Sequence, residues 1–515
     1  MRTIIGWPAS CGSARRALSW EMAADVVLIN PMYLFPPYGP AEVEGLKDDP
    51  LMTDLPSQPF LYPPAGLLSI AGALSRAGFR IEGIDCNATP MTMEELARRC
   101  EGAKVVGIQL LVANARSVYA LVKHMRGRGY EVVIGGPYPS VEPSVVAKMG
   151  LRYGISGEGE IAFVELCDAL INGRGRVEDI AGIIIAEDHE RVWTKHPNLL
   201  DDLENWMMDR TFLRSPLYRQ PFKGAIEVAL ASRGCPYACP FCYCSSASPN
   251  SMFNRSRWVP VDHMVRDLAE ASRVWRPRYI EMLDETFTVS KKYVRELCQG
   301  IIDEGLKFEW GAKTRADLLD PDLLELMARA GLTKIGFGLE SGTYDHRRDM
   351  TKDFGNDHIQ TIFDTANRLR VDPACTILFG HPDETRADMQ ESVDMVKEIN
   401  AAYVEFHIMV LIPGTKLFKR ALAEGKTTED VFDRFMRGEV GYPEYAPGNL
   451  TPADMRAIHK DALRQFYLRP RYIAQQARRA RRPSDLIQYA RAAASIFASA
   501  RDALPAWALG RAAAA

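Results

Sequence analysis

The sequence predicts an α/β protein with a doubly wound, Rossmann-like domain, then a partial, TIM-like (β/α)6 barrel, then a helical C-terminal region. Two observations lead to this prediction. From Asp25 onward short β-branched runs alternate with helical patterns, and a second, longer alternation begins at Ala225. Continuously apolar strands that alternate with helices are typical of parallel sheets covered by helices on both faces.

The first alternation runs without a break to about residue 170. Its apolar runs predict strands over residues 25–30, 80–85, 105–111 and 131–134. Its helical spacing, with Pro64 at one start and Gly78 at one stop, predicts helices over residues 64–75, 93–99, 115–126 and 160–170. Ligands of such sheets bind outside the carboxyl ends of the strands, so the loops there are the candidate binding loops.

The second alternation predicts a barrel of six strands. These strands cover residues 225–230, 279–283, 308–312, 334–338, 374–379 and 403–408, and the intervening helices include 322–330, 357–369 and 386–399. Residues 172–222 show no sustained periodicity and many charges, which indicates a linker. We therefore expect an N-terminal extension (1–24), a first domain (25–171), a linker (172–222), a barrel (223–420) and a helical region (421–515).

The composition excludes several classes of protein. The chain has 515 residues, with 63 Lys and Arg against 66 Asp and Glu and a formal net charge of −3. A dedicated nucleic-acid binder has a clear basic excess, so we expect no nucleic-acid partner. No segment offers the roughly 18 uninterrupted apolar residues of a membrane span, and the first 20 residues lack the apolar run of a secretory signal. We expect a cytoplasmic protein.

The ten cysteines are unevenly placed. Six are scattered and are interpreted as small buried residues: Cys11, Cys86, Cys100, Cys167, Cys298 and Cys375. The other four lie close together, and three of them form Cys235-Pro-Tyr-Ala-Cys239-Pro-Phe-Cys242 after the first barrel strand. Three thiolates on one loop can hold three irons of a [4Fe-4S] cluster and leave the fourth iron open. A structural zinc site needs four ligands, usually as two separated pairs. Cys244 could offer a fourth ligand, but it lies only two residues beyond Cys242, where the geometry would be cramped.

This cysteine spacing, with Phe241 before the third cysteine, resembles the radical S-adenosylmethionine enzymes. Other segments that resemble the family follow at later strand ends: Leu283-Asp-Glu-Thr-Phe287, Gly338-Leu-Glu-Ser-Gly342, Ile377-Leu-Phe-Gly-His-Pro-Asp-Glu384 and Leu411-Ile-Pro-Gly-Thr415. The resemblance covers roughly residues 223–420. It implies a [4Fe-4S] cluster on Cys235, Cys239 and Cys242, S-adenosylmethionine as a cofactor, and an external electron donor of the flavodoxin or ferredoxin kind.

The resemblance also implies which residues bind S-adenosylmethionine. They follow successive strands and are Asp284, Glu285, Arg315, Glu340, Ser341 and Gly380. Asp284 and Glu285 correspond to the contact with the methionine amino group, Glu340 and Ser341 to the contact with ribose and carboxylate, and Gly380 to the adenine segment. The histidines His381 and His407 are interpreted as packing residues rather than ligands.

The loops of the first domain resemble those of the cobalamin-binding domain of class B radical methylases and their cyclase relatives. The implied cobalamin contacts are Pro63, Gly66, Asp85, Gly135, Gly136, Pro137, Ser140, Gly157, Glu158 and Gly159. Glycine lets a ligand approach the backbone, and a helix N-terminus receives a polar group. No histidine lies between Asp25 and Ala120, so we expect no histidine ligand to cobalt from this domain.

The resemblance implies a cobalamin-dependent radical methyltransferase of the EC 2.1.1 class. It would methylate an unactivated carbon of a small-molecule or lipid-like intermediate through methylcobalamin and a 5′-deoxyadenosyl radical. The alternatives are an oxidative or ring-rearranging cyclase of the tetrapyrrole type, a methylthiotransferase with a second cluster on Cys11, Cys86 and Cys100, and a non-catalytic cobalamin sensor. No catalytic residue is assigned.

A basic stretch near the end of the chain has two interpretations. It contains Arg469, Arg471, Arg478, Arg479, Arg481 and Arg482. We interpret it as a solvated helical face, and the alternative is a peripheral contact with an anionic membrane or an amphiphilic substrate.

Overall fold

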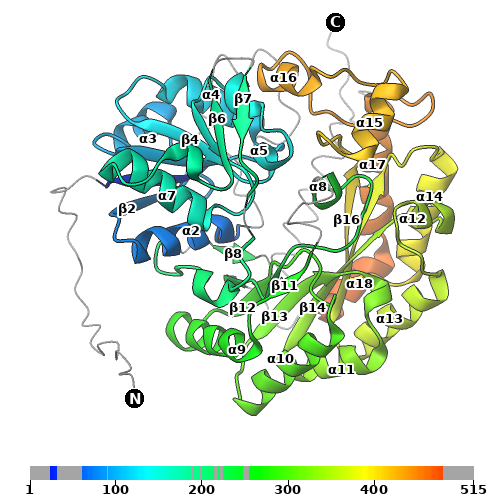
Figure 1. The fold of residues 1–515 in the computed structure, drawn as a ribbon. Helices are drawn as coiled ribbons and strands as arrows, with labels where there is room; N and C mark the ends of the chain where they lie inside the picture. The colour runs from blue at the N-terminus through cyan, green and yellow to red at the C-terminus, as the bar shows by residue number, and fades with distance from the viewer. Residues whose placement is uncertain are drawn as a thin grey trace, which may run out of the picture.

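The computed structural model describes residues 24–31, 61–89, 91–187, 191–197, 199–213, 218–220, 224–246 and 255–479. Cys11, the N-terminal extension, Arg481 and Arg482 lie outside these residues. The chain forms two α/β lobes, each built on one seven-stranded sheet (Figure 1). Among the described residues, no helix is both long and apolar enough to cross a membrane.

The sheet of the first lobe has the order β2-β1-β3-β4-β5-β6-β7. Its strands are β1 (Val26–Asn30), β2 (Ile81–Asp85), β3 (Val105–Gln109), β4 (Glu131–Gly135), β5 (Tyr153–Ile155), β6 (Ile183–Ala186) and β7 (Val192–Thr194). The first five are parallel. The helices are α2 (Ala65–Arg76), α3 (Met93–Arg99), α4 (Ala115–Met125), α5 (Pro137–Val141), α6 (Val145–Lys148) and α7 (Gly159–Asn172).

Alternate residues of β1 enter two separate cores. Val26 and Leu28 pack with Leu67 of α2 and Leu166 of α7. Val27 and Ile29 pack in the other core, with Leu96 of α3 and Val118 of α4. Because side chains alternate across a strand, a strand buried on both faces must be apolar at every position. The predicted doubly wound domain is confirmed.

The segment expected to be a linker, residues 172–222, contains two strands of the first sheet in the structure. Residues 183–186 and 192–194 form β6 and β7, which extend the first sheet in antiparallel fashion from β5. These strands have four and three residues, too few to show a periodic pattern in the sequence.

The second lobe is a curled, mainly parallel sheet with the order β16-β15-β14-β13-β12-β9-β8. Its strands are β8 (Arg219–Gln220), β9 (Gly224–Ala229), β12 (Tyr279–Met282), β13 (Glu309–Thr314), β14 (Leu332–Glu340), β15 (Asp372–Phe379) and β16 (Tyr403–Ile408). The six strands from β9 to β16 are parallel, as the predicted partial barrel requires, and β8 adds an antiparallel edge. A short ribbon, β10 (Ser232–Arg233) with β11 (Arg257–Trp258), lies beside it.

Helices wrap the convex side of this sheet (Figure 1). They are α9 (Val261–Glu270), α10 (Lys291–Asp303), α11 (Pro321–Arg329), α12 (Tyr344–Asp349), α13 (Asn356–Arg368) and α14 (Arg386–Glu398). The remaining helices are α8 (Tyr243–Ser246), α15 (Lys416–Ala423), α16 (Val431–Met436), α17 (Pro452–Tyr467) and α18 (Pro470–Arg479).

The C-terminal helices complete both lobes. The Tyr467 hydroxyl donates to the Val404 carbonyl at 2.8 Å, and Tyr472 donates to Ala402 at 2.9 Å, so α17 and α18 cover the edge strand β16. Covering an open edge prevents it from pairing with another chain. Phe432 and Phe435 of α16 join the core of the first lobe, so the C-terminal region also ties the lobes together.

Candidate functional site

The carboxyl ends of both sheets meet at one cavity of about 640 Å³ between the lobes. Eight of the ten residues expected to contact cobalamin line it: Pro63, Gly66, Gly135, Gly136, Pro137, Gly157, Glu158 and Gly159. The barrel contributes Leu230, Arg233, Gly234, Tyr243, Arg257, Leu283 and Glu285. Of the barrel residues expected to bind S-adenosylmethionine, Glu285 lines this space, so the expected cobalamin loops and one expected S-adenosylmethionine contact face the same cavity.

Bare backbone forms much of the first-lobe wall. Gly136 has φ 112°, and a Cβ there would stand 3.0 Å from the Leu110 carbonyl oxygen. Gly157 also has a positive φ, 81°. Left-handed backbone of this kind favours glycine. The glycine positions of both loops therefore present no side chain to the cavity.

The remaining two expected cobalamin contacts, Ser140 and Asp85, do not line the cavity. The Ser140 hydroxyl donates to the Gly136 carbonyl and accepts from the Gly157 amide, both at 2.8 Å, so it holds the two glycine loops together. Asp85 accepts hydrogen bonds from Asn30 at 2.9 Å and Tyr218 at 2.8 Å, and burial raises the pKa of its carboxyl. Ser140 thus supports the glycine loops, whereas Asp85 connects the end of β2 with the end of β1 and with Tyr218.

The three cysteines occupy the loop between β10 and α8. Gly234, with φ 82°, turns the chain into this loop. Sγ of Cys235 lies 3.4 Å from the Thr286 hydroxyl, and Sγ of Cys239 lies 3.5 Å from the Thr351 hydroxyl. Cys235, Cys239 and Cys242 are partly exposed, whereas Cys244 is buried in α8. Cys86 and Cys100 are buried in the core of the first lobe.

The adjacent carboxylates Asp284 and Glu285 have different surroundings. Asp284 is 4% exposed and accepts hydrogen bonds from the Ser232 hydroxyl and the Ala231 amide. Burial raises the pKa of Asp284 to about 7. Glu285 is exposed and lines the cavity. Of the two, Glu285 is therefore the carboxylate that a ligand can reach.

Glu340 stands at the end of β14 with φ 69°, in the left-handed region that a glutamate rarely adopts. Its Oε1 accepts from Nζ of Lys352 at 2.6 Å, and its buried Oε2 has no hydrogen-bond partner. An unpartnered buried oxygen is unfavourable unless a ligand supplies a donor. Ser341 is fully buried, and its hydroxyl accepts from the Thr343 amide at 3.2 Å.

Gly380 follows β15 with φ 104°, and a Cβ there would stand 2.8 Å from the Tyr445 carbonyl oxygen. The positive φ and the close carbonyl oxygen both favour glycine at this position. The buried Glu384 carboxylate accepts from the amides of Gly380 at 2.7 Å and His381 at 3.1 Å, which shapes the turn.

A buried ion-pair network that was not predicted from the sequence joins the lobes. Glu158 at the start of α7 pairs with Arg257 at 2.8 Å and with Arg233 at 3.3 Å, and Arg233 also pairs with Glu160 at 2.6 Å. Buried charges persist only when paired. In the sequence, the position of Arg233 just before the cysteine loop was the one sign of this network, because the partners of Arg233 are distant in the chain.

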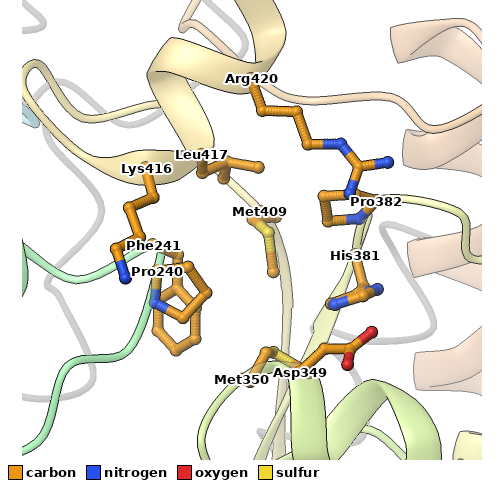
Figure 2. A pocket seen from close by; sticks show the side chains of 10 residues that line it. All are labelled: Pro240, Phe241, Asp349, Met350, His381, Pro382, Met409, Lys416, Leu417 and Arg420. Carbon is orange, nitrogen blue, oxygen red and sulfur yellow. The ribbon is translucent and has the colours of Figure 1, made fainter.

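A smaller cavity, of about 270 Å³, lies on the other side of the cysteine loop (Figure 2). Pro240 and Phe241 of that loop form one wall. The ends of α12, β15 and β16 and the first turns of α15 form the rest, and they contribute Asp349, His381, Met409 and Lys416.

Comparisons with known proteins agree with this geometry. Residues 230–396 match the Radical SAM superfamily, and residues 57–167 match the B12 binding domain. An uncharacterized methyltransferase of Pyrococcus horikoshii is 25% identical over 418 residues, which cover 80% of this chain and 89% of that protein. An anaerobic magnesium-protoporphyrin IX monomethyl ester cyclase of Synechocystis is 26% identical over 303 residues, which cover 56% of this chain and 60% of that protein.

A solved structure shares the fold. The radical S-adenosylmethionine methyltransferase TsrM from Kitasatospora setae, with cobalamin and a [4Fe-4S] cluster bound, superimposes with a TM-score of 0.65 at 17% identity. The match covers 87% of this chain and 90% of that chain.

The fold and the site define a radical S-adenosylmethionine protein with a B12-binding domain. The chain belongs to the cobalamin-binding radical S-adenosylmethionine enzymes, a family whose named relatives include methyltransferases and cyclases. Its cofactors are a [4Fe-4S] cluster, S-adenosylmethionine and cobalamin. The residues fit these groups, since three thiols share one loop, a buried Glu340 oxygen lacks a donor, and glycine backbone walls the large cavity.

Proposed function

We propose that this protein is a cobalamin-dependent radical S-adenosylmethionine C-methyltransferase of the EC 2.1.1 class, acting on a small-molecule or lipid-like intermediate. One observation supports this most strongly: the glycine loops of the first lobe and Glu285 of the barrel line the same cavity. A substrate held between them would face both cofactors at once.

We assign the cofactor contacts as follows. Cys235, Cys239 and Cys242 hold the cluster, and the glycine loops hold cobalamin. Glu285 receives the methionine amino group, because Asp284 is already satisfied by Ser232 and Ala231. The unpartnered oxygen of Glu340 accepts from the ligand.

The cobalamin held by the glycine loops would carry the methyl group, and the cluster held by the three cysteines would supply the electron for reductive cleavage of S-adenosylmethionine. The chain orients both groups and shields the cavity from water. An external one-electron donor of the flavodoxin or ferredoxin kind supplies the electrons. None of the described residues that line the cavity is a histidine, so we expect cobalt to have no histidine ligand from this chain.

The test needs no substrate. Protein loaded with cluster and cobalamin is incubated anaerobically with S-adenosylmethionine and titanium(III) citrate, and the nucleoside products are measured by mass spectrometry. A methyltransferase releases about one S-adenosylhomocysteine per cobalamin as well as 5′-deoxyadenosine. Release of 5′-deoxyadenosine alone would overturn the proposal.

That outcome would instead favour the second candidate, an oxidative cyclase, which the similarity to the magnesium-protoporphyrin cyclase supports. A methylthiotransferase and a non-catalytic cobalamin sensor are both disfavoured. Burial of Cys86 and Cys100 in the core does not suit the second cluster of a methylthiotransferase, and a sensor would leave the cysteine loop unused.

Glu285→Gln provides a second test of the assignment. We expect weaker binding of labelled S-adenosylmethionine, by about tenfold or more, because a charge-assisted hydrogen bond is lost. Asp284→Asn is the matched control, since Asp284 lies beside Glu285 but is turned away from the cavity. Equal effects of the two substitutions would contradict the assignment.

Peripheral membrane contact through the basic C-terminal helix is a further proposal. Arg471 and Ile473 of α18 are exposed, which suits contact with an anionic surface. Flotation with anionic liposomes, comparing the full chain with one lacking residues 469–515, tests it, and equal flotation would contradict it.

A further inference from the structure

Two histidines and an aspartate meet beside the smaller cavity. His346 and Asp349 belong to α12, and their i, i+3 spacing places them on one face of that helix. His381 follows β15 and lines the cavity with Asp349, as Figure 2 shows. One ring nitrogen of each histidine and one carboxylate oxygen of Asp349 all lie within 4.8 Å of one another.

His381 is buried in an unusual way. Its side chain is only 4% exposed, and its Nδ1 atom has no hydrogen-bond partner. The ring centroids of His346 and His381 are 4.5 Å apart, so a second imidazole lies close to this ring. A buried ring nitrogen without a partner is unfavourable, and a cation bound to its lone pair would remove the deficit. From the sequence His381 was interpreted as a packing residue, but packing does not explain why its Nδ1 atom is buried without a hydrogen-bond partner.

A carboxylate lies next to the ring of His346. The carboxylate of Asp388, in the first turn of α14, lies 3.4 Å from Nε2 of His346. Metal-binding histidines commonly have such a carboxylate partner, which fixes the ring orientation and makes the ligand more basic. Asp388 is itself held by the Thr385 hydroxyl and amide, at 2.7 and 2.8 Å.

We propose that His346, Asp349 and His381 form a mononuclear site for a divalent transition-metal ion of the zinc type, separate from the iron–sulfur cluster. Zinc binds imidazole nitrogen and carboxylate oxygen at about 2.0–2.2 Å, which places tetrahedral donors about 3.4 Å apart. The exposed Asp349 stands at the end of α12 and can close the remaining distance by side-chain rotation.

The three protein ligands leave a coordination position open toward the cavity. Lys416 and the apolar side chains of Phe241 and Met409 surround that space. Structural zinc sites close all four positions with protein ligands, whereas a site with three protein ligands keeps one for an exchangeable ligand. The site is therefore of the open type, and it adjoins the loop that carries the cysteines.

The test measures zinc uptake by protein in which the cluster already occupies the cysteines. Cluster-loaded protein without a histidine tag is dialysed anaerobically against Zn²⁺, and zinc and iron are quantified by mass spectrometry. We expect one zinc per chain. His346→Gln and Asp349→Asn should each weaken zinc binding by at least about tenfold and leave iron per chain unchanged. His407→Gln, at an exposed histidine of β16, is the matched control and should bind zinc normally.

X-ray absorption at the zinc edge identifies the ligands. The proposed site gives nitrogen and oxygen neighbours at about 2.0–2.1 Å with imidazole scattering and no sulfur at about 2.3 Å. Absence of zinc, a sulfur shell, or unchanged binding in both variants would each overturn the proposal. Iron content is read separately in every sample, so a failure of the cluster assignment is distinguishable from a failure of this site.

Discussion

The guanidinium carbon of Arg315 lies 3.9 Å from the ring centroid of Tyr237, a residue of the cysteine loop. Arg315 also donates to both carboxylate oxygens of Asp317, at 3.0 and 2.9 Å, and to the Thr351 carbonyl at 2.8 Å. One side chain thus joins the end of β13, the cysteine loop and the segment after α12. Arg315 was expected to contact the cofactor, and its observed contacts are those of a brace for the loop.

Replacing Arg315 by lysine should therefore loosen the cysteine loop. Lysine cannot stack its planar group on Tyr237 or pair with Asp317 in bidentate fashion. Loss of the stacking contact corresponds to about 0.5–1 kcal/mol, or roughly a two- to fivefold faster loss of the cluster in air. The decay of cluster absorbance measures this. Arg295→Lys, at an exposed arginine of α10, should lose its cluster at the parent rate. Equal rates of cluster loss in all three proteins would show that Arg315 does not stabilise the loop.

Replacing Cys244 by alanine should leave the iron content unchanged, whereas Cys239→Ala should lose most of it. Cys244 is 2% exposed and lies within α8, whereas Cys239 is partly exposed and lies in the loop with Cys235 and Cys242. Iron and sulfide per chain, measured after anaerobic reconstitution, check the prediction. Loss of the cluster from the Cys244 variant, with retained secondary structure, would show that Cys244 supplies a fourth thiolate ligand.

The Thr351 hydroxyl should raise the reduction potential of the cluster. It lies 3.5 Å from Sγ of Cys239, and a hydrogen bond to a cluster thiolate favours the more negative, reduced state. Thr351→Val keeps the shape and removes the donor, so its potential should be more negative than that of the parent. Spectroelectrochemical titration measures the change. Thr351→Ser should restore the parent value, and a shift in the serine variant as large as in the valine variant would exclude the hydroxyl as the cause.

The Glu158 network should make the joint between the lobes sensitive to acid. Burial alone would raise the pKa of the Glu158 carboxyl, but Arg257 and Arg233 outweigh burial and hold the pKa below its usual 4.5. A carboxyl with a lowered pKa stabilises the folded state above the unfolded pKa, and this stabilisation is lost as the pH falls through the folded pKa. The contribution of Glu158 is therefore complete at neutral pH, begins to fall near the unfolded pKa of 4.5, and is lost as the pH falls further through the lower folded pKa.

Glu158→Gln should cost about 3–5 kcal/mol at pH 7, because the buried Arg257 loses its carboxylate partner and Arg233 loses one of the two carboxylates that it pairs with. Thermal unfolding between about pH 3 and 8 measures both effects, and the variant should lose less stability than the parent as the solution is acidified. Glu178→Gln, at an exposed pair with Arg176, should change stability by no more than about 1 kcal/mol. Parallel pH profiles of parent and Glu158 variant would contradict the assignment.

Local patterns in the sequence were sufficient to predict most helices and strands of both lobes. Helix α3 and strand β16 have the bounds expected from apolar periodicity, because their contacts follow the 3.6- and 2-residue repeats of the chain. The short strands β6 and β7 were missed, since three or four residues carry no measurable period. Their pairing with β5 is a contact between distant segments.

By itself the sequence determined the α/β class, the three-cysteine loop and the glycine loops, because spacing along the chain defines each of these. Only the tertiary structure decided which carboxylate faces the cavity. Asp284 and Glu285 are neighbours in sequence, yet one is buried against Ser232 and the other is exposed. It also brought His346 next to His381 and Glu158 next to Arg257. These pairs depend on how separate strands and helices pack. Packing between distant segments produces no local pattern in the sequence, so these pairs could not be predicted from it.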